Sequence, residues 1–146
     1  MTIEDHAARC AQEGGIDEAL IEHLVRTFYT RVRSDAVIGP IFNERVHDWE
    51  EHFRILTDFW SNVLLKTQRY NGQTLRVHAV LPIAAPHFAR WLELFAATAR
   101  ELCSPACAML FIAYAERIAA SLQLGIAVAQ GELPPRPVRP TAAIVS

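Results

Sequence analysis

The feature that most constrains the fold is the helical spacing of apolar residues along almost the whole chain. From Ile16 onward, one apolar stripe occupies positions i, i+3, i+4, i+7 and i+11, which is typical of an amphipathic helix with one buried face. Its members are Ile21, Leu24, Val25, Phe28 and Val32, with Tyr29 beside them. We expect Gly39–Pro40 to end this helix. Because no segment shows a convincing strand pattern, the sequence predicts an all-α fold.

Three further long helices follow, and each begins with a local start signal. Asp48 with Glu51 three residues later is close to a capping box and predicts the start of the second helix. Pro86 suits the first turn of the third helix, and Ser104–Pro105 resembles a cap followed by a first-turn proline for the fourth. The face of the second helix is wide, unusually aromatic and contains a histidine; its residues are Trp49, His52, Phe53, Leu56, Phe59, Trp60, Val63 and Leu64.

The remaining segments suggest a single domain with an extension at each end. We expect residues 1–15 to be a loosely ordered N-terminal extension and residues 16–130 to form the domain. The stretch 66–73 reads as a loop, and 74–79 could form one short helix. Residues 131–146 are rich in proline, and we expect a disordered tail there.

Composition excludes several classes of function. The net charge is −2 and basic residues are scattered, so we expect no nucleic-acid partner. The longest uncharged apolar stretch near the C-terminus, residues 105–115, is too short to span a membrane. The first ten residues carry acids and lack the basic start and apolar run of a secretory signal, so we expect a cytoplasmic protein.

Hydrophobic residues make up 51% of the chain, which is more than a soluble domain of this size usually holds. A buried apolar ligand and a dimer interface are both consistent with this surplus. The cysteines Cys10, Cys103 and Cys107 are odd in number and form no C-x-x-C pair. We interpret them as small apolar core residues.

Four side chains could carry chemistry. His78 lies on the expected short helix among apolar neighbours, and His52 lies on the aromatic face of the second long helix. Tyr29 and Trp91 carry neutral hydrogen-bond donors within apolar stripes. From the residues alone, each has an ordinary alternative: a core or boundary histidine, or a core aromatic.

The order of several short motifs resembles the truncated haemoglobins, in particular their third group, and suggests a bacterial protein. The motifs are Phe28–Tyr29, GPIF from Gly39, WEEH from Trp49, DFW from Asp58, YNGQ from Tyr70, HAVLP from His78 and RWLELF from Arg90. The resemblance runs from about Ile16 to about Gln123. It implies a globin-like two-over-two helical sandwich around haem b. No C-x-x-C-H motif occurs, so we expect the haem to be held without covalent bonds.

The resemblance also implies a role for each residue that matches. His78 would be the proximal iron ligand, and Tyr29, Trp91 and His52 would form the distal pocket. His52 could gate entry, donate a hydrogen bond or bind the iron itself. The residues expected to contact the haem are Phe42, Leu56, Phe59, Trp60 and Phe88. The groups that hold the haem propionates are left open, with Lys66, Arg69 and Arg76 as candidates.

A site of this kind implies binding of O2, NO, CO or peroxide. Two donors aimed at one gas would slow its release, which favours detoxification of nitric oxide or reactive oxygen over O2 transport. The chain is too short to include a flavin or nicotinamide domain, so the reductase would be a separate protein. The alternatives are a non-catalytic gas sensor or O2 storage module and, less favoured, a helical interaction domain without a cofactor.

Overall fold

The helices account for most of the chain that the computed structural model describes, which is residues 1–66 and 83–129. No strand occurs in these two ranges, so the predicted all-α class is confirmed. The helices are α1 (Ile3–Gln12), α2 (Glu18–Ser34), α3 (Gly39–Arg45), α4 (Trp49–Leu65), α6 (Ala85–Leu102) and α7 (Pro105–Ala129). The expected short helix at 74–79 and the tail at 131–146 lie outside the described residues.

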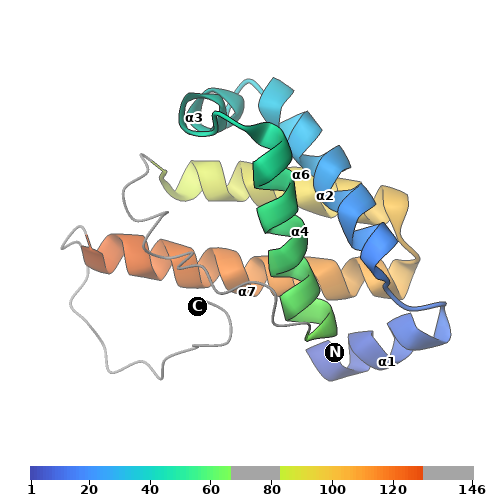
Figure 1. The fold of residues 1–146 in the computed structure, drawn as a ribbon. Helices are drawn as coiled ribbons and strands as arrows, with labels where there is room; N and C mark the ends of the chain where they lie inside the picture. Colours follow the sequence, from blue (N-terminus) through green and yellow to red (C-terminus); the bar gives the residue numbers. More distant parts are fainter. Residues whose placement is uncertain (67–82, 130–146) are drawn as a thin grey trace.

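Four of these helices form two crossed layers around one core. Helices α2 and α4 pack together, α6 and α7 lie side by side, and α2 also packs on α6. Figure 1 shows α4 crossing over the second layer. Phe28 of α2, Phe95 of α6 and Phe111 of α7 are at most 1% exposed and occupy the centre. The apolar sides of α2, α6 and α7 therefore face one another across the layers.

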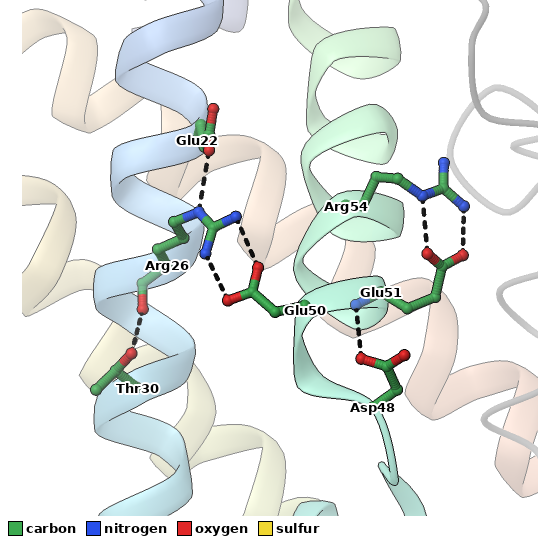
Figure 2. Close-up of polar contacts among 7 residues, drawn as sticks. All are labelled: Glu22, Arg26, Thr30, Asp48, Glu50, Glu51 and Arg54. Atoms are coloured by element: carbon green, nitrogen blue, oxygen red, sulfur yellow. Dashed lines mark hydrogen bonds and ion pairs between the residues drawn. The ribbon is translucent and has the colours of Figure 1, made fainter.

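The starts of the long helices follow the predicted local signals. The carboxylate of Asp48 accepts a hydrogen bond from the Glu51 N–H at 3.2 Å and caps α4. The Glu51 side chain does not complete a capping box and pairs with Arg54 instead. On the neighbouring face, Arg26 of α2 bridges Glu22 and Glu50 (Figure 2). These ion pairs are exposed and therefore contribute little to stability.

The Gly39–Pro40 pair does not simply end a helix, as the sequence suggested. Helix α2 ends at Ser34, and Gly39 begins the short helix α3 with Pro40 in its first turn. The turn between them is held by Asp35, whose carboxylate accepts from the N–H groups of Val37 and Ile38. Arg90 of α6 donates to the same carboxylate at 2.7 Å. Asp35 therefore fixes the start of α3 against α6.

The N-terminal segment is a regular helix, so the expectation of a loosely ordered extension was wrong over residues 3–12. Thr2 and Asp5 form a reciprocal capping box at the start of α1. The helix packs against α7. Its order rests on this contact with a distant part of the chain, which apolar spacing within the segment does not reveal.

A disulfide between Cys10 and Cys107 joins α1 to the first turn of α7, so these two cysteines are not the free core residues that we expected. Both are 2% exposed and pack with Ala106 and Leu110. Cys103 is the free thiol, and burial raises its pKa to about 11. We refer to Cys10, Ala106, Cys107 and Leu110 as the staple cluster.

The cap of α7 also differs from the sequence expectation. Pro105 begins the helix as predicted, but the carboxylate of Glu13 accepts from the Ala106 N–H at 2.9 Å. The segment that follows α1 therefore supplies a capping group that the sequence reading had assigned to Ser104.

Helix α7 is longer than the uncharged stretch that we measured in the sequence. By length and hydropathy alone, 105–128 is the one helix among the described residues that could cross a membrane. Its apolar side instead supplies core residues such as Phe111, Ala115 and Ile118, and Glu116 and Arg117 are exposed near its middle. Burial in the core accounts for part of this hydrophobicity, since 39% of the apolar window is buried and Met109, Leu124 and Val128 are exposed.

Candidate functional site

A cavity of about 260 Å³ lies between the two layers of helices. The predicted distal and haem-contact residues that the structure describes all line it: Tyr29, Phe42, His52, Leu56, Phe59, Trp60, Phe88 and Trp91. They come from α2, α3, α4 and α6, so the fold brings together side chains up to 62 positions apart in sequence (91 − 29). His78, the predicted iron ligand, lies outside the described residues.

The walls of the cavity are mainly apolar and aromatic. Trp60, Phe95 and Trp91 stack in a column, with ring centroids 5.3 and 5.4 Å apart and nearly parallel planes. Phe28 meets Trp91 and Phe95 edge to face at 5.5 and 5.1 Å. Such packing fixes the orientation of Trp91 because moving its ring would disturb several aromatic contacts.

Tyr29 is the most informative polar residue of the site. It lies on α2, is 5% exposed, and its ring centroid is 5.7 Å from that of His52 and 6.1 Å from that of Phe42. Burial raises the pKa of its hydroxyl well above the ordinary value of 10.0, and a hydrogen bond with Trp91 opposes that rise only in part. The phenol therefore remains neutral and keeps its proton.

Trp91 and His52 both lie beside Tyr29. An indole N–H can only donate, so Trp91 is the donor and the Tyr29 oxygen the acceptor in their hydrogen bond. The Tyr29 proton is then directed elsewhere and can serve a second acceptor. His52 lies on α4, its Nε2 atom is buried, and its ring contacts Trp49 at 5.4 Å. We call Tyr29, His52 and Trp91 the donor cluster.

The lining fits a large apolar ligand with a small polar centre and does not fit a bare cation. None of the described lining residues is a carboxylate. No group of three or more His, Cys, Asp or Glu suited to a metal occurs within 1–66 and 83–129. An aromatic-walled cavity with hydrogen-bond donors at one place is an environment that suits a haem. The residues present therefore fit the group that the sequence resemblance implies.

Sequence reasoning missed part of the lining. The missed residues are Ile38, Ile41, Ile55, Ile83, His87, Ile118, Ala119 and Leu122. The α7 members lie on the apolar side of that helix, and periodicity cannot distinguish a core wall from a cavity wall. Lys66, a propionate candidate, donates to the Val63 carbonyl at 3.1 Å and does not line the cavity. Arg69 and Arg76 lie outside the described residues.

Comparisons with known proteins agree on the family. The family model of bacterial-like globins matches residues 13–108. The chain is 39% identical over 85 residues to the group 3 truncated hemoglobin ctb of Campylobacter jejuni, covering 55% of this chain and 67% of that one. The crystal structure of group III truncated hemoglobin from Campylobacter jejuni superposes with a TM-score of 0.73 at 32% identity, covering 76% of this chain and 91% of that one.

The match places helices α2 to α6 in a globin fold, with α1 before the matched region. The globin family supports binding of haem and, through it, of a small gas such as O2. The cavity, its donor cluster and the two crossed layers all accord with that assignment. The chain thus belongs to the bacterial-like globin family, and it is similar to the group III truncated haemoglobins.

Proposed function

We propose that the protein holds haem b without covalent bonds and turns over diatomic or peroxide ligands to remove nitric oxide or reactive oxygen. The observation that supports this most directly is the donor cluster, in which Tyr29 and Trp91 place hydrogen-bond donors together in a mainly apolar cavity. In this proposal His78 would hold the haem by binding its iron. Phe42, Leu56, Phe59, Trp60 and Phe88 contact the ring.

The haem iron would supply the position at which a gas is held and electrons are exchanged. The chain's own residues then determine how long that gas stays. A ligand that gains negative charge in the cavity would accept the Tyr29 proton in a hydrogen bond, while Trp91 holds the phenol oxygen in place. The walls are mainly apolar and aromatic, so the local dielectric is lower than in water and this interaction is stronger.

Slow release favours chemistry over transport. A hydrogen bond to a charged acceptor contributes about 1.5–3 kcal/mol, which corresponds to a release rate lower by roughly 10- to 100-fold or more. A carrier must give up its ligand readily, whereas a detoxifying protein can retain O2 until nitric oxide or another reactant arrives. The electrons would come from an external reductase. The alternative is a gas sensor or storage module without turnover.

An absorption spectrum of the purified protein tests the cofactor first, in the ferric and ferrous states and then with O2 and CO. We expect a haem Soret band and a stable ferrous O2 form. His78→Gly should lose haem or require added imidazole to retain it. His47→Gly is the matched control, because His47 is exposed between α3 and α4 and does not line the cavity. An unchanged spectrum in His78→Gly would refute the proximal assignment.

Turnover distinguishes the two functions. With a reductase present, sustained consumption of nitric oxide under O2 supports the detoxifying function, whereas a single stoichiometric reaction supports a sensor or store. Tyr29→Phe should speed O2 release by about 10-fold or more. If both Tyr29→Phe and Trp91→Phe release O2 as slowly as the wild type does, these donors do not act on the ligand.

We retain the cytoplasmic location expected from the sequence as a proposal. The Cys10–Cys107 disulfide points the other way, since such bonds persist mainly in oxidising compartments. Cell fractionation combined with rapid thiol trapping would decide. Reduced protein in the cytoplasmic fraction supports the proposal, and oxidised protein outside that fraction refutes it.

A further inference from the structure

His87 is a cavity histidine to which neither the sequence nor the proposed function gives a role. It lies in the first turn of α6 and is half-buried, between Ile83 and Phe88 on the cavity lining. It precedes Trp91 by four residues, so the two side chains share one face of the helix. Its place on this lining prompts the question of what its imidazole contacts when the cavity is filled.

One ring nitrogen of His87 already has a partner. The Ala84 N–H donates to Nδ1 at 2.8 Å and so caps the start of α6. A neutral imidazole carries one donor and one acceptor, and Nδ1 is the acceptor here. The proton therefore lies on Nε2, which makes this atom a donor. Coordination of iron by Nε2 would require the proton to move to Nδ1 and would break the cap, so His87 is not a second iron ligand.

The position of His87 on the cavity identifies the kind of acceptor that it would meet. Tyr29, at 5% exposed, and Phe88, at 7% exposed, lie deep in the site, whereas His87 is partly open to solvent. A haem is apolar over its ring and carries two carboxylates at one edge. Burying these charges without partners is costly, so that edge must lie at the mouth of the cavity. Among the described lining residues, His87 is the polar side chain outside the donor cluster.

We propose that His87 binds a haem carboxylate at the mouth of the cavity through Nε2–H while its Nδ1 continues to cap α6. This inference rests on the haem binding proposed above. It assigns to His87 the role that the sequence had offered to Lys66, Arg69 or Arg76. His87 is a positioning residue in this proposal: it would set how the ring sits below the donor cluster and how slowly the haem leaves.

The test compares His87→Gln with His87→Glu. Position 87 is the third residue of α6, and the side-chain oxygen of either Gln or Glu can accept the Ala84 N–H as in a capping box. Only Gln retains a donor for a carboxylate, whereas Glu adds a like charge. The readout is the first-order rate at which ferric haem transfers to an excess of an apo-globin acceptor. We expect the His87→Glu variant to lose haem about 10- to 100-fold faster than the wild type. The rate of haem loss from the His87→Gln variant should stay within about threefold of the wild-type rate.

Haem dimethyl ester, which lacks both carboxylates, is the control ligand. With the ester, the difference between the Gln and Glu variants should disappear. Equal loss of native haem from both variants would overturn the inference, and so would a difference that persists with the ester. Thermal unfolding of the apo-proteins checks that the cap at the start of α6 is intact in both variants. Failure of the wild type to take up haem would instead refute the proposed function itself, so the two failures are distinguishable.

Discussion

The disulfide between Cys10 and Cys107 should contribute a large part of the protein's stability. Its partners are 97 positions apart, so it closes most of the globin domain into one covalent ring. In the chain-entropy treatment, a ring of about 100 residues restricts the unfolded state enough to stabilise the fold by about 4.7 kcal/mol. Typical measured values are about 2–4 kcal/mol, against a total stability of about 5–15 kcal/mol for a domain.

The measurement is equilibrium urea unfolding followed by far-UV circular dichroism, with and without a dithiol reductant. Wild type should lose about 2–4 kcal/mol of unfolding free energy on reduction. The double variant Cys10→Ala, Cys107→Ala should be less stable and should not respond to the reductant. Cys103→Ala is the matched control, because it removes the free thiol and leaves the bond in place. It should respond to reduction as wild type does.

Two results would refute this reasoning. If reduction lowers the unfolding free energy of wild type by less than about 1 kcal/mol, the ring does not restrict the unfolded chain as the entropy treatment requires. If the double variant remains sensitive to the reductant, the effect does not come from this bond. If reduction lowers the unfolding free energy without changing its slope against urea concentration, the oxidised and the reduced protein unfold to the same extent.

Three further predictions follow from individual contacts. Gly39→Ala should destabilise the fold by about 1–3 kcal/mol in thermal unfolding, because the new Cβ would lie 2.9 Å from the Arg33 carbonyl oxygen, a backbone atom; an unchanged melting temperature would contradict this. The Arg90 guanidinium holds the pKa of Asp35 below its ordinary 3.8, so their interaction is fully present above that value and is lost as the pH falls through the lower folded pKa. Asp35→Asn should therefore reduce the loss of stability at acid pH. If the variant loses stability with falling pH as the wild type does, the Asp35–Arg90 ion pair is not the cause of that loss. Glu50→Ala should change the unfolding free energy by at most about 1 kcal/mol, since the ion pair of Glu50 with Arg26 (Figure 2) is exposed to solvent. A larger loss in urea unfolding would show that this ion pair is stronger than its exposure implies.

The sequence predicted the long helices well because their signals are local. Asp48, Pro86 and Pro105 each mark a helix start through a chemical property of a single position. Helix α1 was missed because its order depends on Cys107, far along the chain, and because the Thr2–Asp5 capping box was not recognised. Pairing between distant cysteines cannot be read from spacing.

The site was predicted in a different way. Periodicity would have left Tyr29 and Trp91 as core aromatics, and only the family resemblance assigned them to a ligand. The structure adds that they share a hydrogen bond and line the same cavity. His87 went unnoticed because it lies beside Pro86 at a helix start, where a polar residue is ordinary. Its spacing of four residues from Trp91 was the available signal.

The placement of the tryptophans has an optical consequence. The chain has three: Trp60 and Trp91 line the cavity, and the ring of Trp49 contacts the cavity residue His52. A porphyrin absorbs light at the wavelengths where indole emits, and energy transfer between them weakens steeply with distance. Haem in this cavity would therefore quench every tryptophan in the protein, and no distant indole would contribute a constant background. The intrinsic fluorescence is in this way a built-in gauge of the fraction of molecules that carry the cofactor.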